Sequence, residues 1–314
     1  MVITVTLNPI LEHRYTYSAH DNAPLLRGGI YKRAAGGKGI NVSRQLKELG
    51  IKNTALIFTG GESGRLLKSC LTDEGINFTS VQTAGETRSA SVIEFRDTCK
   101  VQSFFSENVP PAGNEISEFI KRLEKLITMA DVVIFSGSAP DTASAEIIKK
   151  GIELCAQADK ISFIDTYGPH LEDCIKLAPV IVHNNFDEAG LKNAGEPQII
   201  EYLKKMNDSG VKISLLTNGE KEVYASNFGF IYKIQPPAVK TVDATGCGDA
   251  FCAGIINGVQ NSFVFKDSLK YAVSVAASNA GMWEVCKVSA DKAGRYAEQI
   301  EVVSIGDKMN LLNV

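Results

Sequence analysis

The feature that most constrains the fold of this 314-residue chain is an alternation of short apolar runs with longer amphipathic stretches. Apolar runs rich in β-branched residues are typical of strands buried on both faces, and apolar residues three or four apart are typical of helices. Strands are predicted at residues 2–7, 54–59, 131–136, 161–165, 180–183 and 213–217. Helices are predicted around residues 39–49, 63–74, 115–128, 144–158, 197–207, 249–259 and 266–281. This order predicts the α/β class, with a doubly wound, mainly parallel sheet and helices on both faces.

Two segments, residues 10–34 and 87–105, interrupt the alternation. Each contains two short strand-like runs with no helix between them, a pattern typical of hairpins. We therefore predict a main α/β unit made of residues 1–9, 35–86 and 106–314. The two interrupting segments are predicted to form a small separate β-sheet inserted into it.

A pair of glycines separated by one residue, Gly246-Cys247-Gly248, stands at the start of a predicted helix, and Asp249 follows at once. Glycines permit a sharp turn, and backbone amides at a helix N-terminus attract an anion. A carboxylate beside them could take a proton from an attacking hydroxyl. The motif therefore indicates phosphoryl transfer to an alcohol, with a plain structural turn as the alternative. A dinucleotide fingerprint would need a third glycine where the chain has Phe251, and the G-K-[ST] of a P-loop is absent.

A second glycine cluster, Gly36-Gly37-Lys38-Gly39, precedes another predicted helix. Its glycines permit close approach of the backbone to a ligand. Asn41, in the first turn, offers both a donor and an acceptor, which suits the paired hydroxyls of a sugar. The alternative is a glycine-rich loop with a solvated lysine.

The two clusters in this order resemble the G-G-x-G-x-N and D-x-x-G-[AC]-G-D elements of the ribokinase-like (PfkB-type) carbohydrate kinases. The resemblance extends over essentially the whole chain. It implies ATP and Mg²⁺ as co-reactants, Asp249 as catalytic base, and Gly246, Cys247 and Gly248 as an anion hole. It also implies that the small sheet is a lid that closes on the sugar, excludes water and often makes a homodimer contact.

Residues 6–12, Thr-Leu-Asn-Pro-Ile-Leu-Glu, resemble the start of the 1-phosphofructokinase and tagatose-6-phosphate kinase subgroup. There the last residue is an aspartate that holds sugar hydroxyls, so Glu12 is one methylene longer. Arg88 matches an arginine that grips the phosphate already on the substrate, with Lys38 as a second cation. Ser138 is expected to line the sugar site, and Ala90 stands where the subgroup commonly has asparagine.

The expected acceptor is therefore a phosphorylated ketohexose: fructose 1-phosphate, tagatose 6-phosphate or fructose 6-phosphate. The expected enzyme is a phosphotransferase with an alcohol group as acceptor. Two alternatives stay open, namely a kinase of a free sugar or nucleoside and a sugar-binding protein on an altered kinase scaffold. Solvated, purely structural roles are the alternatives for Glu12 and Arg88. A nicotinamide-dependent dehydrogenase is disfavoured by the missing third glycine.

Three further elements resemble the family's nucleotide half, and a fourth departs from it. Asn185 and Glu188 match an N-x-x-E element that organises magnesium mainly through water. Thr217 and Gly219 match a loop that lies against the nucleotide. Asn279 is expected beside the adenine, with simple helix packing as the alternative. His183-Asn184 replaces the Lys-Pro usual in the subgroup.

The composition limits the partners and the compartment. The net charge of −3 and the lack of a basic run argue against nucleic acid, and no apolar stretch is long enough to span a membrane. Seven cysteines without a C-x-x-C pair favour reduced thiols in the cytoplasm, and the first residues read as a strand rather than a signal peptide. The four histidines have no metal-site spacing.

Overall fold

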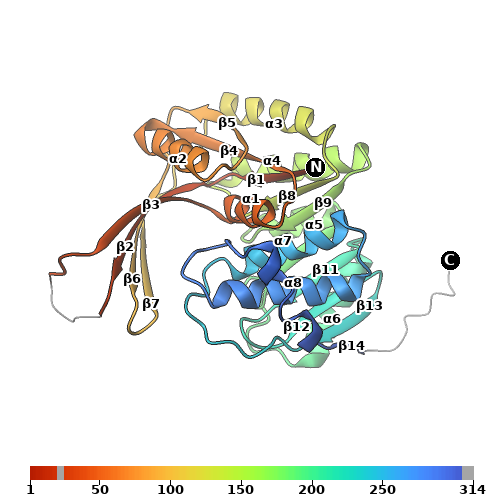
Figure 1. Ribbon diagram of the computed structural model, residues 1–314. Coiled ribbons are helices and arrows are strands. Elements are labelled where there is room, and N and C mark those ends of the chain that lie inside the picture. The colour runs from red at the N-terminus through yellow and green to blue at the C-terminus, as the bar shows by residue number, and fades with distance from the viewer. Residues whose placement is uncertain (20–24, 306–314) are drawn as a thin grey trace.

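A ten-stranded sheet forms the body of the protein (Figure 1) in a computed structural model that describes residues 1–19 and 25–305. Its strands run in the order β14-β13-β12-β11-β10-β9-β8-β1-β4-β5. Seven of them, from β11 to β5, are parallel, and β12, β13 and β14 continue the sheet in antiparallel pairs. Their bounds are β1 (Val2–Thr6), β4 (Asn53–Gly60), β5 (Phe78–Thr83), β8 (Val132–Ser136), β9 (Ile161–Asp165), β10 (Ile181–Asn185), β11 (Ile213–Thr217), β12 (Val223–Asn227), β13 (Phe230–Ile234) and β14 (Val302–Ile305).

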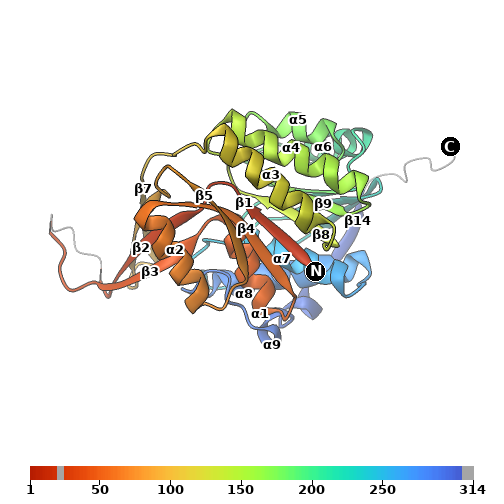
Figure 2. The ribbon, with the colours of Figure 1, turned by 90° about the horizontal axis from the view of Figure 1, so that it is seen from above.

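Helices cover both faces of this sheet, as the view from above shows (Figure 2). One face carries α3 (Gly113–Ile127), α4 (Thr142–Gln157), α5 (Leu171–Lys176) and α6 (Glu196–Asp208). The other carries α1 (Lys38–Glu48), α2 (Gly61–Asp73), α7 (Cys247–Gln260), α8 (Phe265–Ala280) and the short α9 (Ala290–Ala293). The predicted fold class is confirmed, and each predicted strand and helix is present within a few residues of its expected bounds.

The central strands are buried on both sides, which explains their continuous apolar runs. In β8, Val133 and Phe135 pack in the cluster beneath α3 and α4, whereas Val132 and Ile134 pack beneath α1 and α7. Helices α7 and α8 approach so closely that a Cβ atom on Gly254 would lie 2.5 Å from the Cα of Ala272. This tight pair fixes the helix that carries Asp249.

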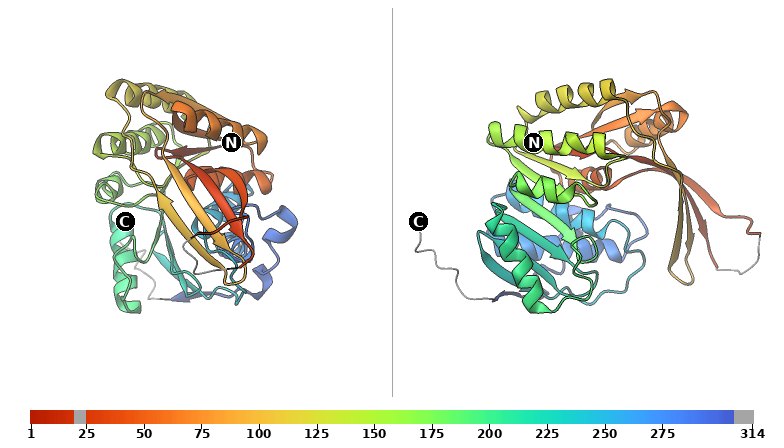
Figure 3. Two further views of the ribbon diagram at one scale, coloured as in Figure 1. Left: turned by 90° about the vertical axis from the view of Figure 1, so that its left-hand side faces the viewer. Right: turned by 180° about the vertical axis from the view of Figure 1, so that it is seen from behind.

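A second, four-stranded sheet extends away from the body (Figures 1 and 3). It has the order β3-β2-β6-β7, made of β2 (Ile10–Tyr17), β3 (Ile30–Gly36), β6 (Ser89–Phe95) and β7 (Lys100–Phe105). We call it the small sheet. Residues 20–24 of the predicted insert 10–34 lie outside the described residues. That the small sheet is a separable unit stays a prediction.

The small sheet has two chemically different faces. Residues paired across its strands share a face, so Glu12, Arg14 and Thr16 point to one side, together with Glu94. The opposite face is aromatic, since it carries His13, Tyr15, Tyr17, Tyr31, Phe95 and Phe104. Among the residues that the structure describes, no helix is both long and apolar enough to cross a membrane.

Candidate active site

The candidate site lies where the carboxyl ends of the parallel strands meet. Asp165 ends β9, His183 and Asn185 lie on β10, and Thr217 ends β11. The glycine-rich start of α1 and the first turn of α7 lie beside these ends, because Lys38 contacts Asp165 and Asn41 contacts Asp249. In open parallel sheets this edge is where ligands bind.

The loop before α7 is held in a tight conformation. Gly246 is the N-cap residue of α7 with a φ of 76°, a left-handed conformation that disfavours other residues. Asp243 Oδ1 accepts a hydrogen bond from the amide of Thr245 at 2.8 Å. The amide of Cys247 donates to the carbonyl of Ala244 at 3.2 Å, so it is already engaged. Gly248 follows in the first turn of the helix.

Asp249 is the buried carboxylate of this first turn, with a relative exposure of 5%. Asn41 Nδ2 donates to its Oδ2 at 2.8 Å, which joins two residues 208 positions apart. Burial and then the charge of Asp165 raise the pKa of Asp249 to about 7, against the opposing effects of Lys38, Asn41 and His183. A carboxylate with such a pKa is suited to accept a proton near neutral pH.

A buried chain of polar contacts runs beside Asp249. Lys38 Nζ donates to Asp165 Oδ1 at 3.2 Å and to Glu188 Oε1 at 2.9 Å. His183 Nδ1 lies 2.9 Å from the same Asp165 oxygen, and its Nε2 lies 3.1 Å from the hydroxyl of Thr217. Burial opposes the charge of Lys38, but the two carboxylates outweigh it and raise the pKa of this lysine.

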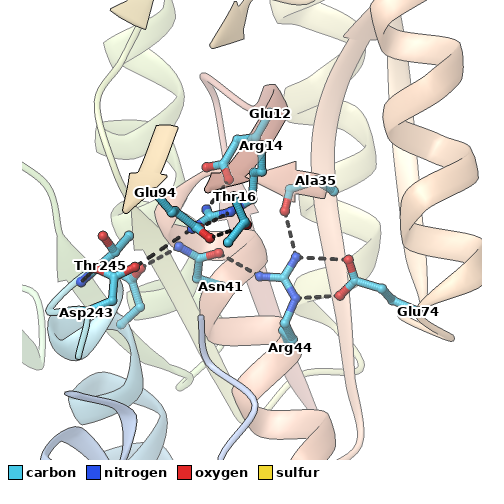
Figure 4. Close-up of polar contacts among 11 residues, drawn as sticks. Glu12, Arg14, Thr16, Ala35, Asn41, Arg44, Glu74, Glu94, Asp243 and Thr245 are labelled. Atoms are coloured by element: carbon cyan, nitrogen blue, oxygen red, sulfur yellow. Dashed lines mark hydrogen bonds and ion pairs between the residues drawn. The ribbon is translucent and has the colours of Figure 1, made fainter. Parts of the chain in front are cut away.

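A cavity of about 180 Å³ lies between the polar face of the small sheet, α1 and the segment 283–287 that follows α8. Glu12, Asn41 and Arg44 line it. Figure 4 shows the polar network around it, in which Arg14 lies among Glu12, Thr16 and Glu94.

Arg14 neutralises part of the negative charge of that network. It donates to Glu12 Oε2 at 2.7 Å and to Glu94 through both Nε and Nη2, while Thr16 donates to the other oxygen of Glu94. Its Nη2 lies 3.8 Å from Asp243 Oδ2, so the small sheet approaches the loop that precedes α7. Glu12 therefore lines the cavity but is paired with an arginine, and its Oε1 faces Gly36, where any Cβ would overlap it.

Arg88 lies apart from Lys38, against residues that follow β1. Its Nη2 donates to the carbonyl of Asn8 at 2.9 Å, and its Nη1 lies 3.4 Å from Asn108 Oδ1. Asn8 Nδ2 in turn donates to Ser138 Oγ at 3.1 Å, so Ser138 lies on the Arg88 side. Burial lowers the pKa of Arg88, and among the described residues no carboxylate forms an ion pair with it.

The remaining predicted residues have defined positions. Asn185 and Glu188 hold each other, since each side chain accepts a hydrogen bond from the other's amide, at 2.8 and 3.0 Å. Gly219 has a φ of 59° in the turn after β11. Gly37, the N-cap of α1, has a φ of 117° and approaches Thr6 and Asn8. Asn279 donates to the carbonyl of Thr245 and accepts from the amide of Cys286, which fits the packing alternative.

Asp165, Arg14 and Asn108 were not singled out from the sequence. Asp165 carried a usable signal, because a carboxylate that ends a buried strand lies at the ligand-binding edge of a parallel sheet. Arg14 and Asn108 carried no such signal, since most of their partners come from distant parts of the chain.

Known proteins resemble this chain in sequence and in fold. The family model described as pfkB family carbohydrate kinase matches residues 12–282. A tagatose-6-phosphate kinase from Staphylococcus epidermidis is 27% identical over 315 residues, covering 97% of this chain and all of that protein. A structure named as a possible 1-phosphofructokinase, from Thermotoga maritima, superposes with a TM-score of 0.88 at 21% identity over 97% of this chain and 99% of its own. Phosphofructokinase-2 from Escherichia coli superposes with a TM-score of 0.85 at 19% identity, over 95% of this chain and 98% of its own.

Proposed function

We propose that this chain, which belongs to the pfkB family of carbohydrate kinases, transfers the γ-phosphoryl group of Mg-ATP to a hydroxyl of a phosphorylated ketohexose. The acceptors we propose are fructose 1-phosphate, tagatose 6-phosphate and fructose 6-phosphate, each giving a bisphosphate. The similarity to a tagatose-6-phosphate kinase along nearly the whole chain supports this substrate class.

The observation that carries the phosphosugar proposal is the surroundings of the Arg88 guanidinium, which has no carboxylate partner among the described residues. This half-buried guanidinium contacts neutral amide and carbonyl oxygens, and burial lowers its pKa, so an anion beside it would stabilise its charge. A phosphate is the fitting anion, because the guanidinium fork can donate to two of its oxygens. The phosphate already on the sugar would therefore contact Arg88, with Asn8 and Ser138 beside it.

The sugar hydroxyls would contact Asn41 and the free oxygen of Glu12 in the cavity under the small sheet. Gly36 leaves room for the Glu12 carboxylate, because any Cβ there would overlap its Oε1, and Gly37 leaves room for Thr6. Asp249, held by Asn41, takes the proton from the attacking hydroxyl. The amides of Gly246 and Gly248 at the start of α7 would face the transferring phosphoryl group, and Cys247, whose amide donates to Ala244, lies between them.

Asn185, Thr217 and Gly219 would line the nucleotide side, with Asn279 supporting the loop. The carboxylates of Glu188 and Asp165 fit magnesium, because they are hard oxygen donors and the buried Asp165 Oδ2 has no hydrogen-bond partner among the described residues. The metal, when bound, would neutralise charge on the phosphates, with Glu188 acting mainly through water.

The aromatic face of the small sheet supports a homodimer in which two such faces meet. His13 stacks on Tyr31 with ring centroids 6.0 Å apart, and Phe104 is 57% exposed. Contiguous exposed aromatic surface is typical of an interface. The seven free cysteines support a reducing, cytoplasmic location.

The substrate proposal is tested by coupled ADP release with Mg-ATP and a panel of fructose 1-phosphate, fructose 6-phosphate, tagatose 6-phosphate, fructose and ribose. Wild type and Arg88→Ala are compared on each acceptor. We expect turnover on one phosphosugar, and a KM for that sugar raised roughly ten- to a hundredfold by Arg88→Ala, since a charged hydrogen bond contributes about 1.5–3 kcal/mol. Turnover on a free sugar that is indifferent to Arg88 would contradict the proposal.

A further inference from the structure

Lys38 occupies an unusual position for a lysine. It is the first residue of α1, where the positive end of the helix dipole disfavours a cation. Its ammonium group nevertheless lies between Asp165 and Glu188, which come from the end of β9 and from the turn after β10. The contacts with these carboxylates therefore hold the ammonium group there, against the unfavourable dipole of α1.

The two carboxylates need this cation. Their side chains are only 1% and 13% exposed, and two buried negative charges close together are costly unless a cation balances them. The other donors to Asp165 and Glu188 are the ring of His183 and the amide of Asn185. Asp165 Oδ2 still has no hydrogen-bond partner among the described residues, so the pair keeps an unused acceptor.

Lys38 also has room to move. Its side chain is 28% exposed, and its Nζ lies 5.2 Å from the centre of the Tyr167 ring. An aromatic face stabilises an ammonium group that is only partly solvated. A flexible four-carbon stem can thus carry the charge away from the carboxylates without leaving the site.

We propose that Lys38 is an internal counter-ion that competes with the metal for Asp165 and Glu188. This rests on the proposed function, in which these carboxylates serve Mg²⁺. In the free enzyme the lysine balances one of the two negative charges of the pair and occupies its oxygens, so bare metal binds weakly. When metal and nucleotide arrive together, the ammonium group is released from the carboxylates and pairs with a phosphate.

The test uses Mn²⁺ without nucleotide, because this ion prefers the same oxygen donors as Mg²⁺ and its binding is followed by water-proton relaxation. Lys38→Met removes the competing charge but keeps the length of the side chain. We expect Lys38→Met to bind Mn²⁺ at least about tenfold more tightly than wild type, which corresponds to about 1.4 kcal/mol. Lys38→Arg keeps the charge and should bind like wild type.

Three further variants make the result decisive. Lys176→Met removes an exposed lysine paired with Asp173, and it should leave Mn²⁺ binding unchanged. Adding Glu188→Gln to Lys38→Met should abolish the increase in Mn²⁺ affinity, which would show that the ion binds at the carboxylate pair. If Lys38→Met does not fold, Lys38→Gln takes its place, because it also removes the charge but stays polar.

Mn²⁺ binding by the folded Lys38→Met or Lys38→Gln variant that is no tighter than in wild type would overturn the proposal. This failure differs from failure of the proposed function. A wild-type protein with no turnover on any acceptor would refute the kinase assignment, whereas the Mn²⁺ comparison is made without substrates.

Discussion

Replacing Asp249 by asparagine is expected to stabilise the folded protein at pH 8 while removing its activity. Burial, followed by the charge of Asp165, raises the pKa of Asp249 from 3.8 to about 7. Each pKa unit corresponds to about 1.4 kcal/mol, so the ionised carboxylate destabilises the folded state by roughly 4 kcal/mol. Asparagine carries no charge, and its carbonyl can still accept the hydrogen bond from Asn41.

The pH dependence has a definite sign. The pKa of Asp249 is higher in the folded than in the unfolded protein, so its contribution to stability is complete below about pH 4 and is lost as the pH rises through 7. At pH 5 about 2 kcal/mol has been lost, and above pH 7 about 4 kcal/mol. The advantage of Asp249→Asn over wild type should therefore grow by roughly 2–3 kcal/mol between pH 5 and pH 8.

The assay is urea denaturation of both proteins at the two pH values, at constant ionic strength and without ligands. Asp208→Asn, at the exposed end of α6, is the control and should show no such growth. At pH 8 the turnover of Asp249→Asn should fall by roughly 10²–10⁴-fold, the usual effect of losing a general base. This reasoning would be refuted if the stability advantage of Asp249→Asn over wild type were equal at both pH values. It would also be refuted if the variant were less stable than wild type at pH 8.

Two further predictions concern the anion loop and the aromatic face. Gly246→Ala should cost at least roughly 1–2 kcal/mol of stability by denaturation and also reduce kcat, because Gly246 has a φ of 76° and the new methyl would overlap Val285. Gly190 has a φ of 71°, but nothing lies within contact of an added methyl, so Gly190→Ala should lose only the stability due to backbone strain and keep kcat. Phe104→Asp should convert the proposed dimer to a monomer in light scattering, whereas Phe228→Asp, equally exposed at another surface, should not. A dimer that survives Phe104→Asp, or equal losses of kcat in the two glycine variants, would contradict these expectations.

The parallel part of the fold was predictable because its strands are buried on both faces. Val132 to Phe135, for example, form an unbroken apolar run whose residues divide between two cores. β5 and the antiparallel strands β13 and β14 lack this signal, whereas β12 is buried from Val223 to Ser226 but has an apolar run of only three residues. In β5 only Val81 is buried, and β13 has two half-buried residues between its two buried ones, so neither reads as a buried run.

In the candidate site, the two glycine clusters identified the elements that meet at Asp249. The structure brings Asn41, from one cluster, into contact with Asp249, from the other. The partners of Lys38, Asp165 and Glu188, could not be predicted from the sequence, because they are 127 and 150 positions away. Their contacts depend on how the ends of β9 and β10 lie beside α1. The pairing of Glu12 with Arg14 was hidden as well, since it depends on the pleat that places both residues on one face.

The central claim is that this protein moves a phosphoryl group from ATP to a sugar that already carries phosphate. Phosphorus NMR of wild type with Mg-ATP and each phosphosugar tests it most directly, because it follows both the donor and the product. We expect the γ-phosphate signal of ATP to disappear as a second phosphomonoester signal grows on one sugar. Growth of inorganic phosphate alone, or a spectrum that does not change with any of the acceptors, would contradict the claim.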